Sequence, residues 1–313
     1  MLIKFLLFVE IRTKLASIIP FFLGTCYAIY RYERFSFINA LIMFISLLSF
    51  DMATTAINNY LDYKKAIRLR HDDEENLIVI VGNIAEKSAR LIILSLLAVA
   101  VTAGLALFYQ TDIIVLLVGA LSFTVGVFYT FGPVPLSRMP LGEVFSGFFM
   151  GFVIFFLAIY IHIFDLGISS IILEESRLIV TVDILEVFYI FLLSVPIMAG
   201  IANIMLANNI CDIDDDIVNR RFTLPYYLGR ENSLFLFKVL YYISYFDIVL
   251  VVILGLTPKL VSLCLLTLIP VQKNIRIFAD NPLKNITFML SVQNFFMMNF
   301  AHLVLLLLSI TLF

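Results

Sequence analysis

The chain has 313 residues, of which 62% are hydrophobic and only 14% are charged, and its mean hydropathy is +1.04. A water-soluble domain of this length needs more polar surface than this composition supplies. The net charge of −2 is too small to indicate a nucleic-acid partner. Cys26, Cys211 and Cys264 are widely spaced, so we interpret them as small core residues rather than as disulfides or a metal site. The composition predicts a polytopic membrane protein.

Nine apolar segments approach or exceed the length that crosses a bilayer, about 20 residues per helix. They cover residues 15–30, 38–59, 90–109, 113–131, 142–163, 185–210, 234–255, 259–271 and 290–313. The eighth is short, and we expect it to tilt or to extend into its flanks. The preceding MLIKFLLFVEIRTK is amphipathic and lacks a small-residue cleavage site, which favours an interfacial lead-in over a signal peptide. We predict one all-α domain over residues 1–313, with about nine transmembrane helices in a bundle.

The distribution of lysine and arginine predicts how this bundle is oriented. With nine spans, the N-terminus and the loops near residues 60–89, 132–141, 211–233 and 272–289 share one side, which carries most of the basic residues. The basic residues on the opposite side are Arg31, Arg34, Arg177 and Lys259. Under the positive-inside rule, the N-terminus and the longer loops are therefore cytoplasmic. We expect an integral protein of the cell (inner) membrane.

Two similar polar stretches end apolar segments on this cytoplasmic side. TTAINNYLDYKK closes the second segment and MLANNICDIDDD closes the sixth, each with paired asparagines followed by an acid. On a helix, Asn208, Asp212 and Asp216 follow at i, i+4 and i+8 and share one face. Asn58 and Asp62 share a face in the same way. Because four segments separate the two stretches, we predict two half-sites that face each other.

The residue types in these half-sites indicate a metal ion and a diphosphate. Clustered carboxylates beside a low-dielectric core repel one another and need a cation or protons. Oxygen ligands without nearby histidine or cysteine suit Mg²⁺ or Mn²⁺, and Mg²⁺ completes its shell with water and phosphate oxygens. The basic residues that follow the two stretches are Lys64, Lys65, Arg68, Arg70, Arg220 and Arg221. Their charge suits a diphosphate leaving group. The alternative is a solvated loop that obeys the topology rule, but this does not require asparagines at matched spacing.

Four stretches of the chain form a wider pattern. They are EIRTKLASIIPFFLGT (10–25), NNYLDYKKA (58–66), YTFGPVPLSRMPLGEVFSGFFMG (129–151) and NNICDIDDDIVNRRFTLPYYLGR (208–230). Together with the predicted spans, they resemble the UbiA superfamily of intramembrane aromatic prenyltransferases. The resemblance is greatest to the 1,4-dihydroxy-2-naphthoate polyprenyltransferase branch in menaquinone synthesis. It covers nearly the whole chain, and the last stretch is its most specific part.

This resemblance implies a fold, a reaction and a set of ligands. Members bind a polyprenyl diphosphate through Mg²⁺ held by both acidic motifs, and an aromatic acceptor attacks the allylic carbocation that ionisation produces. In the naphthoate branch the acceptor also loses its carboxylate, which gives demethylmenaquinone. The apolar spans are then expected to enclose a tunnel for the isoprenoid tail, and the active site opens at the cytoplasmic face. The implied partners are a polyprenyl diphosphate, an aromatic acceptor and membrane lipid.

Matching the motifs residue by residue gives the candidate site. We assign Asp62, Asp212 and Asp216 to metal binding and catalysis, and Tyr129 to catalysis. The residues assigned to diphosphate binding are Asn58, Lys64, Arg68, Arg138, Asn208 and Arg221. Glu143 belongs to the same mid-chain stretch as Arg138, and an ordinary helix-end charge explains either residue equally well.

The first motif departs from the family pattern. Asn59 stands where many members have an aspartate, and Ala66 and Arg68 occupy the usual positions of a further one. Asp62 is then the one certain carboxylate of this half-site. The acids of RHDDEEN (70–76) are candidate substitutes. Alternatively, Arg68 contacts the diphosphate directly and only one metal is firmly held.

Three other functions stay open on the sequence alone. The acceptor is a different ring, such as a hydroxybenzoate or homogentisate; the chain is a transporter or lipid-binding protein that uses the acids for a cation or a phosphorylated lipid; or it is a silent family member that binds prenylated quinones. The concentration of charge at one face counts against a transporter. Asp51 and Asp247, within the second and seventh segments, have no predicted role.

Overall fold

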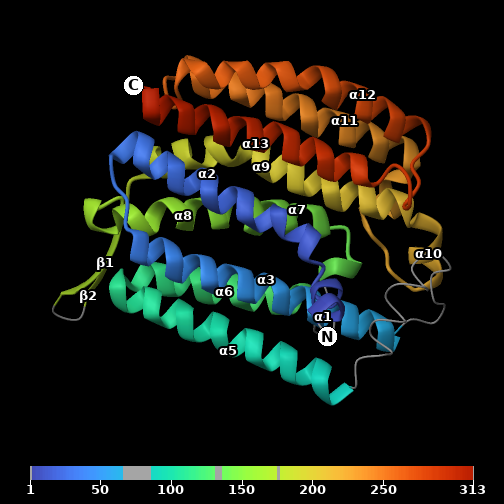
Figure 1. Cartoon of the computed structure of the whole chain (residues 1–313), viewed down its shortest axis with the longest axis horizontal. Coiled ribbons are helices and arrows are strands. Elements are labelled where there is room, and N and C mark those ends of the chain that lie inside the picture. Colours follow the sequence, from blue (N-terminus) through green and yellow to red (C-terminus); the bar gives the residue numbers. More distant parts are fainter. Residues whose placement is uncertain (1, 66–85, 131–135, 175–176, 313) are drawn as a thin grey trace.

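The apolar stretches fold as long helices that lie side by side along the molecule (Figure 1). The computed structural model describes residues 2–65, 86–130, 136–174 and 177–312. Its α-helices are α1 (Leu2–Phe8), α2 (Leu15–Tyr32), α3 (Phe37–Lys65), α5 (Glu86–Gln110), α6 (Ile113–Thr130), α7 (Gly142–Ser146), α8 (Ile154–Ile163), α9 (Ile184–Cys211), α10 (Ile213–Val218), α11 (Leu224–Ile253), α12 (Leu268–Asp280) and α13 (Met289–Leu312). The other helical pieces are the 3₁₀ turns η1 (Ile11–Lys14), η3 (Leu136–Arg138), η5 (Phe164–Leu166) and η6 (Lys259–Thr267), and the π-helical turn η4 (Gly147–Val153) between α7 and α8.

Within the described residues, seven helical stretches are long and apolar enough to cross a membrane. They are Phe37–Leu61, Glu86–Gln110, Gly142–Leu166, Ile184–Cys211, Leu224–Ile253, Lys259–Asp280 and Met289–Leu312. Ile113–Tyr129 is a shorter apolar helix. The polytopic helical bundle is therefore confirmed, while the count of nine spans stays a prediction. The short eighth segment extends into its C-terminal flank, as expected.

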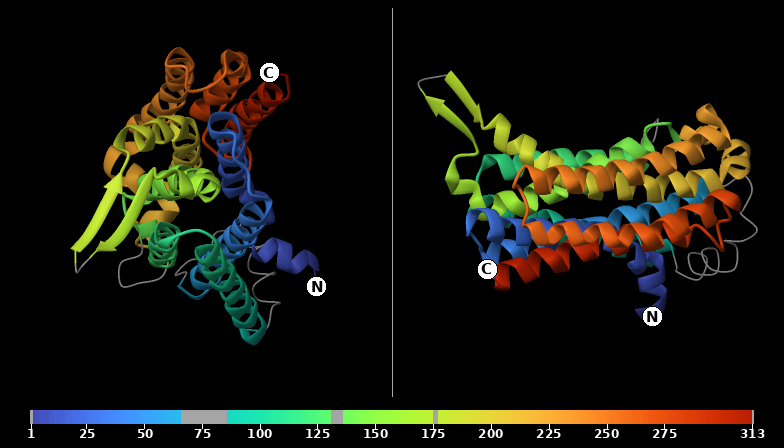
Figure 2. Two further views of the ribbon diagram at one scale, coloured as in Figure 1. Left: turned by 90° about the vertical axis from the view of Figure 1, so that its left-hand side faces the viewer. Right: turned by 90° about the horizontal axis from the view of Figure 1, so that it is seen from above.

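A β-hairpin projects from one end of the bundle (Figures 1 and 2). Strands β1 (Ser169–Glu174) and β2 (Arg177–Val182) pair antiparallel, with Ile171 opposite Val180. We predicted only a connection here, because two short runs rich in β-branched residues carry a weak signal beside long apolar segments. The all-α class describes the bundle, and the hairpin is an addition to it.

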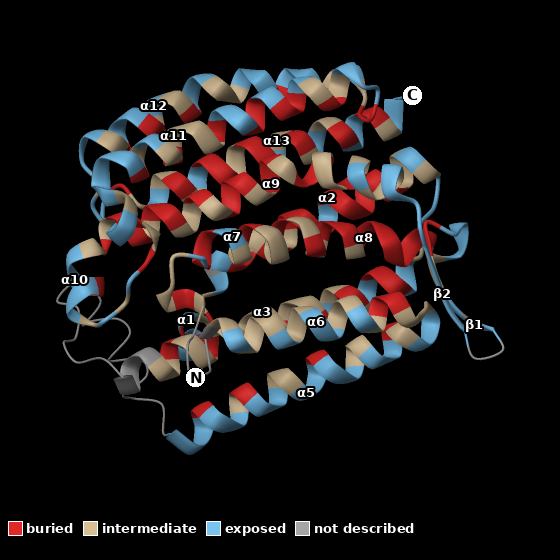
Figure 3. Cartoon of the chain, turned by 180° about the vertical axis from the view of Figure 1, so that it is seen from behind, coloured by how far each residue is buried: buried red, intermediate tan, exposed pale blue. Residues whose placement is uncertain are grey.

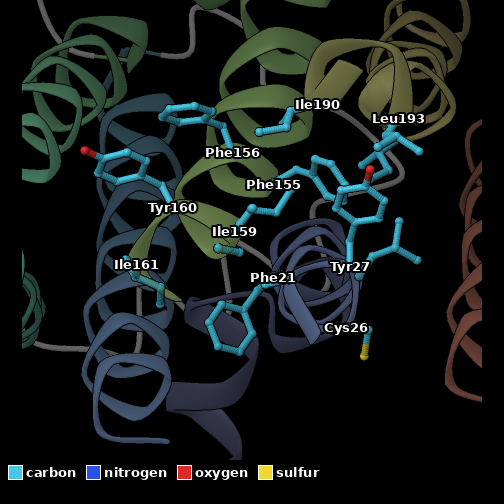
Figure 4. Packing of buried hydrophobic residues seen from close by; sticks show 14 of the residues in the cluster. Phe21, Cys26, Tyr27, Phe155, Phe156, Ile159, Tyr160, Ile161, Ile190 and Leu193 are labelled. Atoms are coloured by element: carbon cyan, nitrogen blue, oxygen red, sulfur yellow. The ribbon is translucent and has the colours of Figure 1, made fainter. Parts of the chain in front are cut away.

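Helix backbones approach closely in the middle of the bundle, where α8 contacts α2 and η4 contacts α9. A Cβ on Gly24 of α2 would lie 2.7 Å from the Phe155 carbonyl oxygen, and one on Gly151 would lie 2.7 Å from Cα of Met198. Only glycine permits such an approach of two helix backbones. Around this contact, Tyr27 and Phe155 are among the large side chains that fill the core (Figure 4).

Burial is uneven across the bundle (Figure 3). Buried positions concentrate on the central helices α8 and α9, whereas α5, at the edge, exposes large apolar side chains such as Leu91 and Leu94. In water such a face would be an apolar patch, but for a membrane protein it is the face that contacts lipid. The amphipathic lead-in forms α1 and η1, and Phe8 and Val9 pack against α3 and α5 through Ala56, Ala89 and Ile93.

A buried ion pair joins the start of α2 to α3. The Lys14 ammonium lies 2.6 Å from Asp51 Oδ1 and also donates to the Asp51 carbonyl oxygen and to Thr55 Oγ1. The Ser17 hydroxyl donates to Asp51 Oδ2. All three ammonium donors and both carboxylate oxygens are therefore satisfied, which offsets the cost of burying the two charges. This contact gives Asp51 the structural role that the sequence did not predict.

Replacing Lys14 by Met is expected to destabilise the protein by about 3–5 kcal/mol, because the Asp51 carboxylate is then buried without a counter-charge. Adding Asp51→Asn removes that charge and restores part of the loss. Thermal unfolding of the detergent-purified variants measures both effects, with Lys4→Met, at an exposed position, as the control. A double variant less stable than Lys14→Met would contradict this account.

Candidate active site

A cavity of about 1260 Å³ lies between the helices, lined by residues of α2, α3, α5, α6, η4, α9 and α13. Much of its wall is apolar, with side chains such as Leu47, Phe123 and Phe149. One end is polar, and the side chains there include Asn58, Tyr129, Arg138, Asn208, Arg221 and Lys284. Figure 1 shows that α3 and α9 both finish at the end of the bundle opposite the hairpin. Two asparagines from the two distant motifs, Asn58 and Asn208, thus line the same cavity.

The second acidic motif lies where one helix stops and another begins. Helix α9 ends at Cys211, and Asp212 connects it to α10 with a non-helical φ of −102°. The i to i+4 backbone bonds still hold across this break, from Asp212 N to Asn208 O (3.2 Å) and from Asp216 N to Asp212 O (2.8 Å). Asp212 and Asp216 are buried, whereas Asp214 and Asp215 are exposed. The four acids therefore divide into an inward pair and an outward pair.

Lys284 supplies the positive charge beside Asp212. Its ammonium lies 2.8 Å from Asp212 Oδ2, donates to Asn208 Oδ1, and sits 5.1 Å from the centre of the Phe288 ring. Lys284 lies in the loop near residues 272–289, which was predicted to be cytoplasmic, and it was not among the residues predicted for the site. A lysine in a polar turn between two apolar helices satisfies the topology rule on its own, so no sequence signal marks it.

Arg221 and Thr223 approach the other buried acid. Arg221 Nε lies 3.5 Å from Asp216 Oδ1, and the Thr223 hydroxyl lies 3.4 Å from Asp216 Oδ2. The Phe222 amide donates to the carbonyl oxygen of Arg138, at 3.1 Å, which ties the chain after α10 to η3. This backbone contact places the side chains of Arg138 and Arg221 along the same cavity.

Glu143 connects the mid-chain stretch to the second motif. It lies in the first turn of α7, is buried, and accepts a hydrogen bond of 2.8 Å from Asn209 Nδ2. The paired asparagines therefore have different tasks, since Asn208 faces the cavity and Asn209 holds α9 against α7. Tyr129, at the end of α6, lines the cavity, and its buried hydroxyl makes no hydrogen bond to the described residues.

Part of the first motif can be placed. Asn58 lines the cavity, and Asn59 is buried and donates from Nδ2 to the Phe8 carbonyl oxygen at 3.1 Å. An aspartate at position 59 could not make that bond while ionised, so the amide there serves the packing of α1. The side chains of Asp62 and Lys64, all of Arg68 and the acids of 70–76 lie outside the described residues.

A family model, the UbiA prenyltransferase family, matches residues 17–305. The chain belongs to the UbiA prenyltransferase family. 1,4-Dihydroxy-2-naphthoate octaprenyltransferase of Bacillus subtilis (strain 168) is 27% identical to it over 244 residues, covering 78% of this chain and 72% of that protein. This UbiA-family chain is thus a membrane prenyltransferase.

Solved structures share the fold of this UbiA-family protein. The apo structure of a UbiA homologue from Aeropyrum pernix K1 has a TM-score of 0.68 at 18% identity, covering 91% of this chain and 97% of that one. The structure of a UbiA homologue from Archaeoglobus fulgidus bound to DMAPP and Mg²⁺ has a TM-score of 0.64 at 14% identity, covering 99% and 100%.

The donor atoms of the second motif fit a hard cation. In the described part of this UbiA-family chain, no three acidic, histidine or cysteine side chains gather closely enough to form a metal cluster by themselves. Asn208 Oδ1 and Asp212 Oδ2 nevertheless already converge on one positive centre, the Lys284 ammonium. Oxygen donors of this kind are those that Mg²⁺ prefers, and Mg²⁺ needs few carboxylates when water and phosphate complete its shell.

Asn209→Leu is expected to destabilise this prenyltransferase by about 1–3 kcal/mol, because Glu143 then stays buried without its donor. Adding Glu143→Leu removes both partners and should recover most of that loss. The readout is thermal unfolding in detergent, with the exposed Asn232→Leu on α11 as the control. If the double variant were no more stable than Asn209→Leu, the contact would not tie α7 to α9 as described.

Proposed function

We propose that this UbiA-family prenyltransferase transfers a polyprenyl group from its diphosphate to 1,4-dihydroxy-2-naphthoate, with Mg²⁺ as cofactor, in menaquinone biosynthesis. The observation that carries this proposal is that one cavity joins a polar, cation-bearing end to an apolar chamber. A polyprenyl diphosphate has the same two parts, a polyanionic head and an apolar tail. The choice of acceptor and of pathway rests on the name of the Bacillus subtilis relative.

The diphosphate would bind at the polar end. Arg138, Arg221 and Lys284 line the cavity there, and fixed cations in a low-dielectric site stabilise the oxygens that gain charge as the C–O bond breaks. Asn208, Asp212 and Asp216 would hold Mg²⁺, which when bound supplies Lewis-acid stabilisation of the leaving group.

The first motif, on the facing helix α3, would complete the binding site for the diphosphate group. Asn58 lines the cavity, and we carry Asp62, Lys64 and Arg68 forward as further metal and diphosphate contacts. Because the second motif begins at the end of α9 and Asn58 lies on α3, the two half-sites would bind the diphosphate group from both sides.

The rest of the cavity suits an electrophilic alkylation. The allylic C–O bond breaks with its electron pair leaving on the diphosphate, and the ring carbon that bears the acceptor carboxylate forms the new C–C bond to the carbocation. Loss of the acceptor carboxylate as CO₂ then restores the aromatic ring. Tyr129, Phe145 and Phe149 offer aromatic faces along the cavity, and such faces attract a cation. The apolar wall would exclude the water that otherwise captures the carbocation.

We also propose that the polar end of the cavity and the N-terminus face the cytoplasm. The support is the excess of lysine and arginine on the side that carries both acidic motifs. A cell-membrane location follows from this proposal, because both substrates are then reached from the cytoplasm and the inner leaflet.

One observation favours a second function, the binding of prenyl lipids without turnover. Asp212 is paired with Lys284 and Asp216 with Arg221, so both buried acids of the second motif have a counter-charge within the chain. A member in which these pairs persisted would bind a prenyl diphosphate or a prenylated quinone and need no metal. The following assay separates the two functions.

Membranes containing the protein are expected to form a prenylated naphthohydroquinone from 1,4-dihydroxy-2-naphthoate and a long-chain prenyl diphosphate in Mg²⁺, and none in EDTA. The product is detected as the quinone after oxidation in air. Asp212→Asn should lower the rate by about 100-fold or more, a typical loss when one electrostatic group of a transition state is removed. Product is measured by chromatography and mass.

Asp214→Ala is the matched control, because this exposed acid of the same motif lies two residues from Asp212. Its activity should equal that of the wild type. Full activity of Asp212→Asn, or turnover in EDTA, would contradict the metal assignment. If product formed only with a hydroxybenzoate or homogentisate, that ring would be the acceptor instead of 1,4-dihydroxy-2-naphthoate. If the protein bound prenyl lipids but formed no product with any acceptor, the second function would be established.

A further inference from the structure

Asp212 is a buried carboxylate at the junction of two helices. It follows the last residue of α9, whose dipole disfavours a negative charge there, and it precedes the short helix α10 without capping it through its side chain. A carboxylate in this position requires a cation beside it whether or not a substrate is present. In the structure that cation is Lys284, which comes from the turn between α12 and α13, 72 residues further along the chain.

The ammonium occupies the point at which a metal would bind. Its contacts use Asn208 Oδ1 and Asp212 Oδ2, which are oxygen donors from the motif expected to hold Mg²⁺. A Mg²⁺ ion that bound both oxygens at about 2.0–2.1 Å would lie close to the ammonium that contacts them, and the two positive charges would repel each other. The lysine and the metal therefore compete for this point.

The Lys284 ammonium has an alternative binding partner within reach in the cavity. Two of its three donors contact Asn208 and Asp212, which leaves one for a further partner, and the residue lines the cavity. Its ammonium already lies over the Phe288 ring, and its side chain is long and unbranched. A diphosphate bound at the polar end would present several anionic oxygens to that ammonium at the moment when Mg²⁺ arrives.

We propose that Lys284 is a resident counter-cation of the second motif, which holds Asn208 and Asp212 in the substrate-free protein and passes to the diphosphate when Mg²⁺ takes its place. This inference rests on the proposed function. It makes metal and diphosphate binding cooperative, because the diphosphate compensates the lysine that the metal displaces. Mg²⁺ alone must compete with the ammonium and therefore binds weakly.

Removing the lysine should strengthen the binding of the metal alone. For Lys284→Met we expect a Mg²⁺ midpoint about tenfold lower than that of the wild type, within the usual range for coupled ligands. Without Mg²⁺ the variant should melt at a lower temperature than the wild type, since Asp212 then loses its contact with the Lys284 ammonium. The measurement is the melting temperature of the detergent-purified full chain against Mg²⁺ concentration, with no prenyl substrate present.

Further variants make the result specific. Lys284→Arg keeps the charge and should retain a midpoint near that of the wild type, and the exposed Lys273→Met on α12 should match the wild type throughout. Asp212→Asn should abolish the response to Mg²⁺. Should Lys284→Met fail to fold, Lys284→Gln removes the same charge and keeps a polar side chain.

The outcomes distinguish a failure of the Lys284 proposal from a failure of the proposed metal-dependent function. The inference is supported if the Mg²⁺ midpoint falls in Lys284→Met or Lys284→Gln but not in Lys284→Arg or Lys273→Met. An unchanged or raised midpoint, with a wild type that responds to Mg²⁺ through Asp212, overturns the inference and leaves the proposed function intact. A wild type that does not respond to Mg²⁺ even with a prenyl diphosphate present overturns the metal-dependent function itself.

Discussion

The burial of two carboxylates at the end of an apolar helix is the constraint on which the site depends. Asp212 and Asp216 lie at the junction of α9 and α10, beside a low-dielectric bundle, and neither position is tenable without a positive partner. Arg221 reaches Asp216 from the chain that follows α10, and Lys284 reaches Asp212 from the turn before α13. The chain that follows α10 and the turn before α13, which lies 72 residues beyond Asp212, are thus drawn to one end of the bundle.

The same rule recurs where other polar groups are buried. Lys14 and Asp51 neutralise each other between α2 and α3, and Glu143 receives the amide of Asn209 between α7 and α9. Each contact joins two helices at a defined position. The polar contacts thus determine how the helix ends are aligned, and the apolar faces between them are left to form the wall of the cavity.

The helical bundle could be predicted from sequence, because a span is a local property of about 20 consecutive residues. The Asn-x-x-x-Asp spacing also carried over, since the i to i+4 bonds continue through the break at Asp212. Lys284 could not be found in this way, because its role is a tertiary contact 72 residues from Asp212. Asn59 is a similar case. It stands where many family members have an aspartate, but its side-chain amide donates a hydrogen bond to the carbonyl oxygen of Phe8, the last residue of α1.

The account rests on one exchange, in which a metal and a diphosphate replace the internal pairing of the second motif. The most direct measurement is an experimental structure of the protein with Mg²⁺ and an unreactive polyprenyl diphosphate analogue. The account predicts Mg²⁺ bound by Asp212 and Asn208, the Lys284 ammonium on a diphosphate oxygen, and the prenyl tail in the apolar part of the cavity. A structure in which the analogue is bound while Lys284 still pairs with Asp212, and no metal contacts the motif, would contradict it.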